Sequence, residues 1–418
     1  MTRQLVLWFE TNAVGDLDQL ADGRHQFRYR ESWIADPAAF PISLSMPLQT
    51  DAFPDRLTRA FFGGLLPDDE ARRRLARHLQ VSARNEFALL AEVGRECAGA
   101  LALYPPDLTP PDAGDPPSPR VLGDGELATL LRELPQRPLL AGKELRLSLA
   151  GAQDKIAVVL HDGVVALPAP GAPTTHILKV PITNYEATVA NEFFAMRLAA
   201  ATGLTVPVTE MRVVDGMPIL LVERFDRWRD ERGRLRRRHQ EDFCQALGVP
   251  PDHKYQAEGG PSLPAMFDLL TKHSSLAAID RLALLQMAQF HFLLGNADAH
   301  AKNFSLLHEP RQVRLAPVYD AMCTLVYPSL STRMAMKIDS RYEFDEVMPD
   351  HWAKLAATIH MAPPAVRERL RGLADALPGL AREVVAALPG LVAEPLIARI
   401  ETTLSARCRR VLDQLRAR

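Results

Sequence analysis

Gly295-Asn296-Ala297-Asp298-Ala299-His300-Ala301-Lys302-Asn303 is the stretch of this 418-residue sequence that most restricts the fold and the chemistry. It follows an apolar helical segment, and a further aspartate, Asp320, comes 22 positions after Asp298. Phosphoryl transfer from ATP needs a carboxylate to orient and deprotonate the attacking hydroxyl, and carboxylate and amide oxygens to hold Mg²⁺. Asp298, Asn303 and Asp320 supply these groups in the order of the catalytic and metal-binding loops of protein kinases.

The same residues also have other interpretations. Asp298 could cap a turn, and Asp320 could end a strand. A zinc site formed by His291, Asp298 and His300 is a further alternative, but no additional strong ligand follows at metal spacing.

A second candidate site lies upstream, in the sequence SLAGAQDK of residues 148–155. Its small residues would let backbone N–H groups approach an anion, and Lys155 would add a positive charge. It matches neither of the common glycine-rich phosphate motifs, so an ordinary tight connection is the alternative. Lys179 follows in an apolar, strand-like segment, where it is either an edge residue or a buried cation that needs an anionic partner.

The pattern along the chain divides it into four parts. Residues 1–104 read as an α+β subdomain, and residues 105–120 as a linker, because seven prolines fall within positions 105–119. Residues 121–239 carry β-branched runs separated by Asp-Gly turns, which predicts a mostly antiparallel sheet with one helix at residues 185–201. Residues 240–418 read as a helical lobe, with helices at residues 240–247, 263–272 and 280–294 and about four more after Pro349.

Composition narrows the class of protein. The net charge of −2 is too balanced for binding to nucleic acid through overall basicity. The four cysteines show no CxxC or CxxH spacing, which fits a reducing cytosol. No run of about 18 uncharged apolar residues is present, so we expect no membrane span.

Six sequence segments resemble the motifs of one known family. They are SLAGAQDK, ILKVP, VERFDR, HQEDFCQALG, GNADAHAKNFSLL and APVYD. These segments look like the motifs of the HipA-type serine/threonine kinases, the toxins of type II toxin-antitoxin pairs, and the resemblance covers nearly the whole chain. It implies a bilobal, protein-kinase-like α+β architecture with an N-terminal subdomain.

The resemblance also implies roles for individual residues. Asp298 would be the catalytic base, Asn303 and Asp320 would bind Mg²⁺, and Ser148 would be an autophosphorylation site. The residues implied to bind ATP are Ala150, Gly151, Ala152, Gln153, Lys155, Lys179, Glu223, Phe225, Asp226, Gln240, His300 and Lys302. Among these, Glu223 and Phe225 would present the backbone that binds adenine, at the junction between sheet and helical lobe. Asp226 and Gln240 would lie near the ribose.

The partners implied by the resemblance are a protein substrate, with an aminoacyl-tRNA synthetase as the first candidate, and a small DNA-binding antitoxin of the HipB type. DNA would be contacted through that antitoxin, and the protein would act in the cytoplasm. Two other functions stay open at this point. One is a small-molecule kinase of the same bilobal fold, and the other is a non-catalytic partner that only helps an antitoxin to repress its operator.

The segment of residues 227–239 contains seven arginines. We interpret it as a solvated hairpin, with local attraction of an acidic protein or an RNA as the alternative.

We predict that the kinase phosphorylates its own Ser148 and that this phosphate weakens ATP binding. Phosphoserine adds a charge of about −1.5 to −2 beside backbone donors that would bind the phosphates of ATP, and two polyanions cannot share those donors. The structural alternative is a hydroxyl that hydrogen-bonds nearby backbone. Peptide mass spectrometry of wild type and Asp298→Ala after incubation with ATP measures the modification, and nucleotide titration of the phosphorylated form measures its effect. An unmodified Ser148 in active protein contradicts the prediction.

Overall fold

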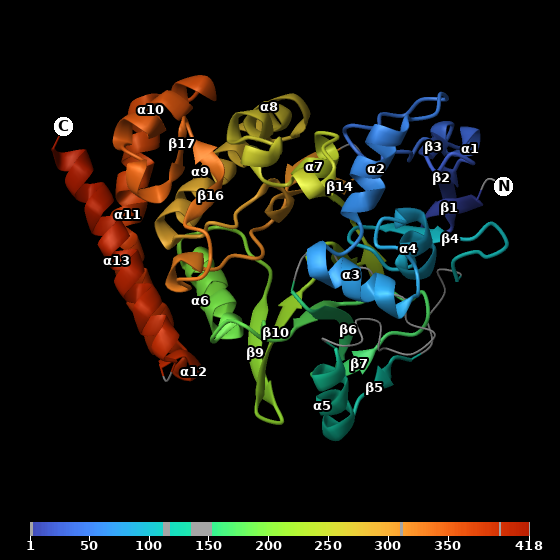
Figure 1. The fold of residues 1–418 in the computed structure, drawn as a ribbon, viewed down its shortest axis with the longest axis horizontal. Coiled ribbons are helices and arrows are strands. Elements are labelled where there is room, and N and C mark those ends of the chain that lie inside the picture. Colours follow the sequence, from blue (N-terminus) through green and yellow to red (C-terminus); the bar gives the residue numbers. More distant parts are fainter. Residues whose placement is uncertain (1–2, 112–117, 135–152, 310–311, 393, 418) are drawn as a thin grey trace. The chain divides into compact units, whose positions relative to one another are not determined.

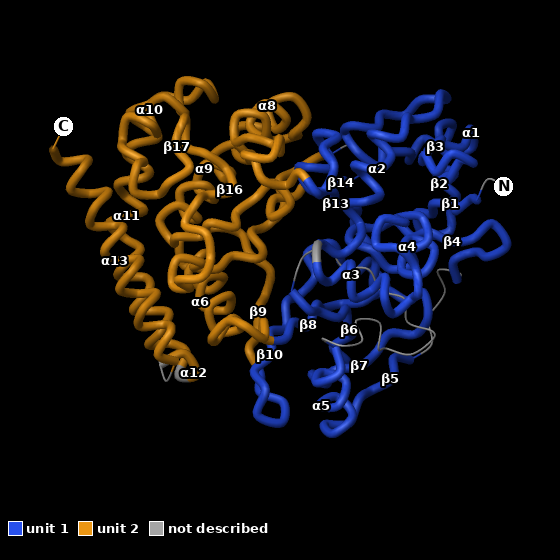
Figure 2. The backbone as a smooth tube through the Cα atoms, in the orientation of Figure 1, with its two compact units in different colours: residues 1–180, 212–252, 306–312 blue, residues 181–211, 253–305, 313–418 orange. Residues whose placement is uncertain are grey.

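The structure is a computed structural model that describes residues 3–111, 118–134, 153–309, 312–392 and 394–417. The chain divides into two compact units (Figure 2). Unit 1 holds residues 1–180, 212–252 and 306–312, and unit 2 holds residues 181–211, 253–305 and 313–418. Strands and helices both occur in the first half of the chain, and helices predominate in the C-terminal part (Figure 1), so the predicted α+β class is confirmed.

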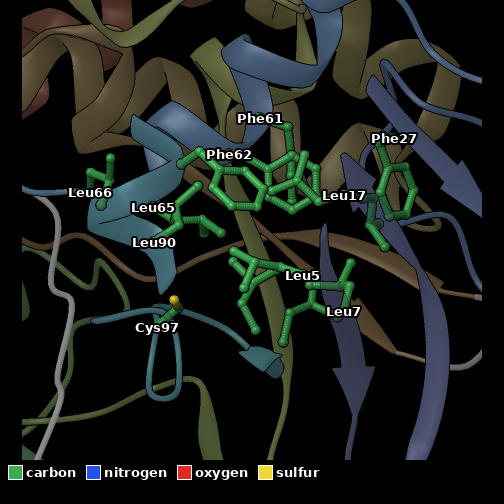
Figure 3. Close-up of a cluster of buried hydrophobic side chains, with 14 of the residues drawn as sticks. Leu5, Leu7, Leu17, Phe27, Phe61, Phe62, Leu65, Leu66, Leu90 and Cys97 are labelled. Carbon is green, nitrogen blue, oxygen red and sulfur yellow. The ribbon is translucent and has the colours of Figure 1, made fainter. Parts of the chain in front are cut away.

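Unit 1 begins with a four-stranded antiparallel sheet of order β3-β2-β1-β4. Its elements are β1 (Arg3–Phe9), β2 (Asn12–Gln19), β3 (His25–Tyr29) and β4 (Leu101–Tyr104), with helices α1 (Glu31–Ile34), α2 (Asp55–Gly64), α3 (Asp69–His78) and α4 (Glu86–Val93). Leu5 and Leu7 of β1 point to one face and meet Phe61 and Phe62 of α2 in a buried cluster (Figure 3). Alternation along the strand therefore gives this sheet a helix-covered core.

The second sheet of unit 1 has six strands in the order β5-β7-β6-β8-β10-β9. They are β5 (Arg120–Val121), β6 (Lys155–His161), β7 (Val164–Leu167), β8 (His176–Lys179), β9 (Thr209–Val214) and β10 (Met217–Glu223), and α5 (Asp124–Glu133) packs against the sheet. Asp162 and Gly163 both have positive φ, as do Asp215 and Gly216. These are the two-residue turns that the Asp-Gly pairs predict.

The arginine-rich segment forms the expected hairpin, from β11 (Arg227–Arg229) and β12 (Leu235–Arg237). Several further short strands escape the sequence pattern. They are β13 (His239–Asp242), β14 (Ser305–Glu309), β15 (Gln312–Leu315), β16 (Arg333–Ile338) and β17 (Arg341–Glu343). The helix predicted over residues 240–247 is wrong in its first half, because β13 runs to Asp242 and α7 (Phe243–Ala246) begins only after it. Asp242 ends the strand by accepting a hydrogen bond from the backbone N–H of Gln245 at 2.8 Å, while the Gln245 side chain accepts from the Asp242 N–H.

Unit 2 is built mainly from helices. They are α6 (Thr188–Ala201), α8 (Leu263–His273), α9 (Ala277–Leu294), α10 (Pro349–Thr358), α11 (Pro363–Ala387), α12 (Pro389–Val392) and α13 (Pro395–Arg416). The four helices after residue 348 confirm the prediction, and α11 packs against α6, α9, α10 and α13. The helix predicted from residue 185 begins three residues later, because Ala187 has a left-handed φ of 48°.

Two further observations bear on the sequence predictions. The four cysteines are free and buried. Among the described residues, no helix combines the length and apolar composition needed to cross a bilayer.

Candidate active site

The candidate catalytic loop of unit 2 starts where α9 ends, at Gly295. This residue has a left-handed φ of 80°, and its N–H donates to the carbonyl of His291 at 3.1 Å. A Cβ atom at this position would lie only 2.9 Å from Cδ1 of Leu325. Both the backbone conformation and the close contact therefore require glycine, which turns the chain sharply out of the helix.

The residues after Gly295 are fixed by hydrogen bonds to the buried end of α9. The Asn296 side chain accepts a bond from the Asp298 N–H at 3.0 Å and donates to Nδ1 of His291 at 3.1 Å. Burial lowers the pKa of His291 to about 4, so the ring is neutral and its Nδ1 can accept. The loop thus has a defined conformation before it reaches Asp298.

Asp298 presents its carboxylate to solvent, with 54% of the side chain exposed. Its Oδ1 accepts a hydrogen bond from the hydroxyl of Tyr255 at 2.6 Å and lies 3.9 Å from Nε2 of His300. Its backbone carbonyl accepts from Nδ2 of Asn303 at 2.9 Å. The structure therefore places Asp298, His300 and Asn303 together in one loop, which ends in the 3-10 turn η3 (Ala301–Asn303). Lys302, in the same turn, is buried.

Asp320 has a left-handed φ of 53°, a conformation that aspartate adopts more readily than most residues. The preceding residue joins this segment to the catalytic loop, because the Tyr319 hydroxyl donates to the carbonyl of Lys302 at 2.7 Å. The segment that carries Asp320 is thereby tied to the turn that carries Asn303.

The donor chemistry of this region fits Mg²⁺. Asn303 and Asp320 offer oxygen atoms, and Mg²⁺ typically takes one or two carboxylates and completes its shell with phosphate oxygens and waters. Over the part of the chain that the structure describes, no group of three or more His, Cys, Asp or Glu residues could hold a metal ion. The zinc alternative thus finds no support, since His291 already bonds to Asn296.

The predicted phosphate-binding lysines lie on neighbouring strands of unit 1. Lys155 of β6 and Lys179 of β8 are directly opposite each other in the antiparallel register, so their side chains leave the sheet on the same face. Lys179 is only 4% exposed. Gln153 is fixed nearby, because its Nε2 donates to the carbonyl of Val180 at 2.8 Å.

Four of the predicted residues, Ser148, Ala150, Gly151 and Ala152, lie outside the described residues. At the end of β10, Glu223 is exposed and Phe225 is half-buried. The strand connection is fixed because the N–H of Arg224 donates to the carbonyl of Thr175 at 2.9 Å. Gln240 donates to Oδ2 of Asp226 at 3.1 Å, so these two predicted ribose neighbours contact each other.

Asp226 itself belongs to a buried ion cluster that sequence reasoning missed. The cluster consists of Glu96, Arg224, Asp226, Arg227 and Arg237. Oε1 of Glu96 lies 2.7 Å from Arg227 and 3.2 Å from Arg224, and Oε2 lies 2.5 Å from Arg237. The guanidinium of Arg224 lies 2.7 Å from Asp226. Although burial raises the pKa of Glu96, the three guanidinium groups hold it well below its usual range.

This ion cluster fastens the N-terminal subdomain to the predicted adenine-binding segment. Arg224 also donates to the carbonyl of Cys97, and the N–H of Gly99 donates to Oδ2 of Asp226 at 2.7 Å. Residues 96–99 and 224–227 are therefore held against each other by charge-assisted bonds. No local motif surrounds Glu96, so this role has no signal in the sequence.

Comparison with known proteins identifies the class of this protein as a kinase. The chain matches the HipA N-terminal domain over residues 5–104 and the HipA-like C-terminal domain over residues 147–381. The chain belongs to the HipA family of serine/threonine protein kinases.

Individual relatives agree with this assignment. The protein Y4mE of Sinorhizobium fredii is 47% identical over 376 residues, which cover 89% of this chain and 90% of that protein. The serine/threonine-protein kinase toxin HipA of Shewanella oneidensis is 30% identical over 96% of this chain and 94% of its own length. A solved structure of Shewanella oneidensis HipA with HipB and operator DNA matches with a TM-score of 0.86 and 28% identity, over 99% of this chain and 98% of that one.

We predict that Glu96→Gln lowers the free energy of unfolding by about 3–5 kcal/mol at pH 7, because three guanidinium groups of the cluster then share the single carboxylate of Asp226. Since the pKa of Glu96 is lowered in the folded protein, its contribution is present above the unfolded pKa of about 4.3 and is lost as the pH falls below it. The difference between the two proteins in urea unfolding should therefore shrink below about pH 4.

The matched control is Glu231→Gln, which removes an exposed carboxylate from the same arginine-rich segment. It should unfold like wild type at every pH. Equal stability of Glu96→Gln and wild type at pH 7 would contradict the role given to the ion cluster.

Proposed function

We propose that this kinase transfers the γ-phosphoryl group of ATP, with Mg²⁺, to a serine or threonine hydroxyl of a protein, and that this activity arrests growth. The observation that carries the proposal is the loop of residues 295–303. It exposes the carboxylate of Asp298, and it fixes the Asn303 side chain to the backbone carbonyl of Asp298. The name of the Shewanella oneidensis relative, a serine/threonine-protein kinase toxin, supports a protein acceptor over a small molecule.

In the proposed reaction, Asp298 accepts a hydrogen bond from the acceptor hydroxyl and takes its proton as the hydroxyl oxygen bonds to the γ-phosphorus. The bond from that phosphorus to the bridging oxygen breaks, and ADP leaves. Asn303 and Asp320 would hold Mg²⁺, which neutralises charge on the phosphates when bound. A site that is open to solvent at Asp298 suits an acceptor side chain presented by another protein.

Most of the proposed nucleotide contacts belong to unit 1, and His300 and Lys302 of unit 2 would add to them. Lys155 and Lys179, which share one face of the sheet, would contact the phosphates. The backbone at Glu223 and Phe225 would bind adenine, and the ion cluster would keep that backbone in place. Asp226 has its carboxylate within the cluster, and its contact with ribose stays a prediction, as does that of Gln240.

We further propose that a small DNA-binding antitoxin of the HipB type regulates this kinase, and that DNA is reached through the antitoxin. The match to a HipA chain solved with HipB and operator DNA supports this proposal. The use of ATP and a protein acceptor fits the cytoplasm. A purely non-catalytic role would need none of Lys179, Asp298, Asn303 and Asp320, so their joint presence argues against it.

We predict that Asp298→Ala and Asp298→Asn reduce phosphoryl transfer by a factor of about 100 to 10,000 while the protein remains folded, because a positioned base is lost from an exposed loop. Phosphoproteomics of cells that express wild type or Asp298→Ala measures this loss and identifies the substrate. Growth arrest should disappear with the activity. Asp268→Ala, which removes an exposed aspartate of α8, is the matched control. Transfer at the wild-type rate by Asp298→Ala would refute the assignment.

We predict that Asp320→Asn and Asn303→Ala each weaken Mg²⁺-dependent ATP binding by at least about 10-fold, because the first removes the negative charge of a ligand and the second removes an oxygen ligand. Asparagine tolerates a left-handed φ, so Asp320→Asn tests the charge without new backbone strain. Calorimetry with and without Mg²⁺ gives the measurement.

The control for this experiment is Asp339→Asn, because Asp339 has the same φ of 53° in the turn between β16 and β17. It should leave nucleotide binding unchanged. If Asp320→Asn binds ATP with Mg²⁺ as tightly as wild type, Asp320 is not a metal ligand.

A further inference from the structure

Tyr255 is a residue that no sequence motif assigned, yet its hydroxyl donates to Oδ1 of Asp298 over 2.6 Å. The two residues are 43 positions apart and both belong to unit 2. The bond is short, as expected when the acceptor is an ionised carboxylate. It occupies one oxygen of Asp298 and leaves the other, Oδ2, for an acceptor hydroxyl.

The backbone around Tyr255 is tightly wound. Its carbonyl accepts hydrogen bonds from the N–H groups of Glu258 and Gly260, both at 3.0 Å. A Cβ atom on Gly260 would lie 2.3 Å from the carbonyl oxygen of His253, so only glycine fits there. The next residue, Gln256, joins the loop to β16, because its Oε1 accepts from the N–H of Lys337 at 2.9 Å. Tyr255 therefore stands on a fixed support.

The ring of Tyr255 is held as well. The imidazole of His300 meets it edge-on, with ring centroids 5.4 Å apart, and Nζ of Lys254 lies 5.6 Å from the ring centroid. Both neighbours are buried, with exposed fractions of 4% and 8%. An aromatic contact and a cation–π contact thus fix the direction of the hydroxyl toward Asp298.

We propose that Tyr255 is a positioning residue, which sets the orientation of the Asp298 carboxylate for proton transfer. Asn303 cannot do this, because its amide bonds to the backbone carbonyl of Asp298 and leaves the side-chain torsions unconstrained. The proton of the acceptor hydroxyl passes to Oδ2 of Asp298, while Tyr255 keeps its own proton throughout. This inference rests on the proposed role of Asp298 as the catalytic base.

The test is Tyr255→Phe, which removes the hydroxyl and keeps the ring contacts with His300 and Lys254. We expect kcat for the protein acceptor to fall about 10- to 100-fold, the range for loss of one hydrogen bond to a charged group. The KM for ATP and the thermal midpoint should stay at the wild-type values. Tyr342→Phe, which removes a hydroxyl from β17, is the matched control and should behave as wild type.

A double variant distinguishes a positioning role of Tyr255 from a purely structural one. In single-turnover assays, Tyr255→Phe should have no further effect when Asp298 is already alanine, because the hydroxyl then has no carboxylate to orient. A kcat of Tyr255→Phe equal to or above that of wild type would overturn the inference. So would a rise in the KM for ATP, a lower thermal midpoint, or a loss of rate that adds to that of Asp298→Ala.

The same assays distinguish this inference from the proposed function. If wild type phosphorylates protein and Asp298→Ala does not, the proposed function stands whatever Tyr255→Phe does. If Asp298→Ala is as active as wild type, both the function of Asp298 and the role of Tyr255 are refuted.

Discussion

The buried C-terminal end of α9 is the constraint on which the candidate catalytic loop depends. A helix end leaves carbonyl groups that need partners, and here the partners also shape the loop. Gly295 turns the chain, and Thr324 from η4 (Thr324–Val326) donates to its carbonyl at 3.1 Å while accepting from the N–H of Ala297 at 2.7 Å. The Ala297 carbonyl accepts from Ala335 of β16 at 2.9 Å. A helix, a 3-10 turn and a strand thereby fix the residues that precede Asp298, so an exposed side chain stands on a rigid base. Catalytic groups placed in this way lose little entropy when the substrate binds.

Unit 1 contains two contrasting arrangements of charged side chains. In unit 1, Glu96 and Asp226 lie among arginines with almost no exposure, and the cluster is stable because each buried charge faces an opposite one. On the neighbouring sheet, Lys155 and Lys179 are placed side by side with the same charge. The first arrangement holds two segments of backbone together. The second puts two lysines on one face of the sheet, which is the placement that the proposed contacts with the phosphates of ATP need.

Sequence patterns predicted the turns and helices whose conformation depends mainly on neighbouring residues. The Asp-Gly pairs predicted both turns, and the helix expected over residues 263–272 is formed by α8. The strands β13–β17 were missed because they are short and lie in a helix-rich part of the sequence, where pairing with a distant strand decides the outcome. Of the candidate site, the motif residues Asp298 and Asn303 came from spacing. Tyr255 and Glu96 could not, because Asp298 lies 43 residues from Tyr255, and the arginine partners of Glu96 lie 128 or more residues away along the chain.

The arginine-rich segment shows that a run of arginines in a sequence need not produce an equally positive surface. Residues 227–239 do form a hairpin, β11-β12, yet Arg227 and Arg237 are drawn into the ion cluster beneath it. The arginines that pair with carboxylates elsewhere are Arg234 and Arg236 with Asp230, and Arg238 with Glu309. Of the seven, Arg229 and Arg232 are the exposed ones for which the described residues supply no carboxylate. Because opposite charges within the fold already neutralise most of the segment, its sequence alone is a poor argument for an acidic protein or an RNA as a partner. A structural role explains the hairpin better, because its arginines in the ion cluster fix the backbone that follows β10.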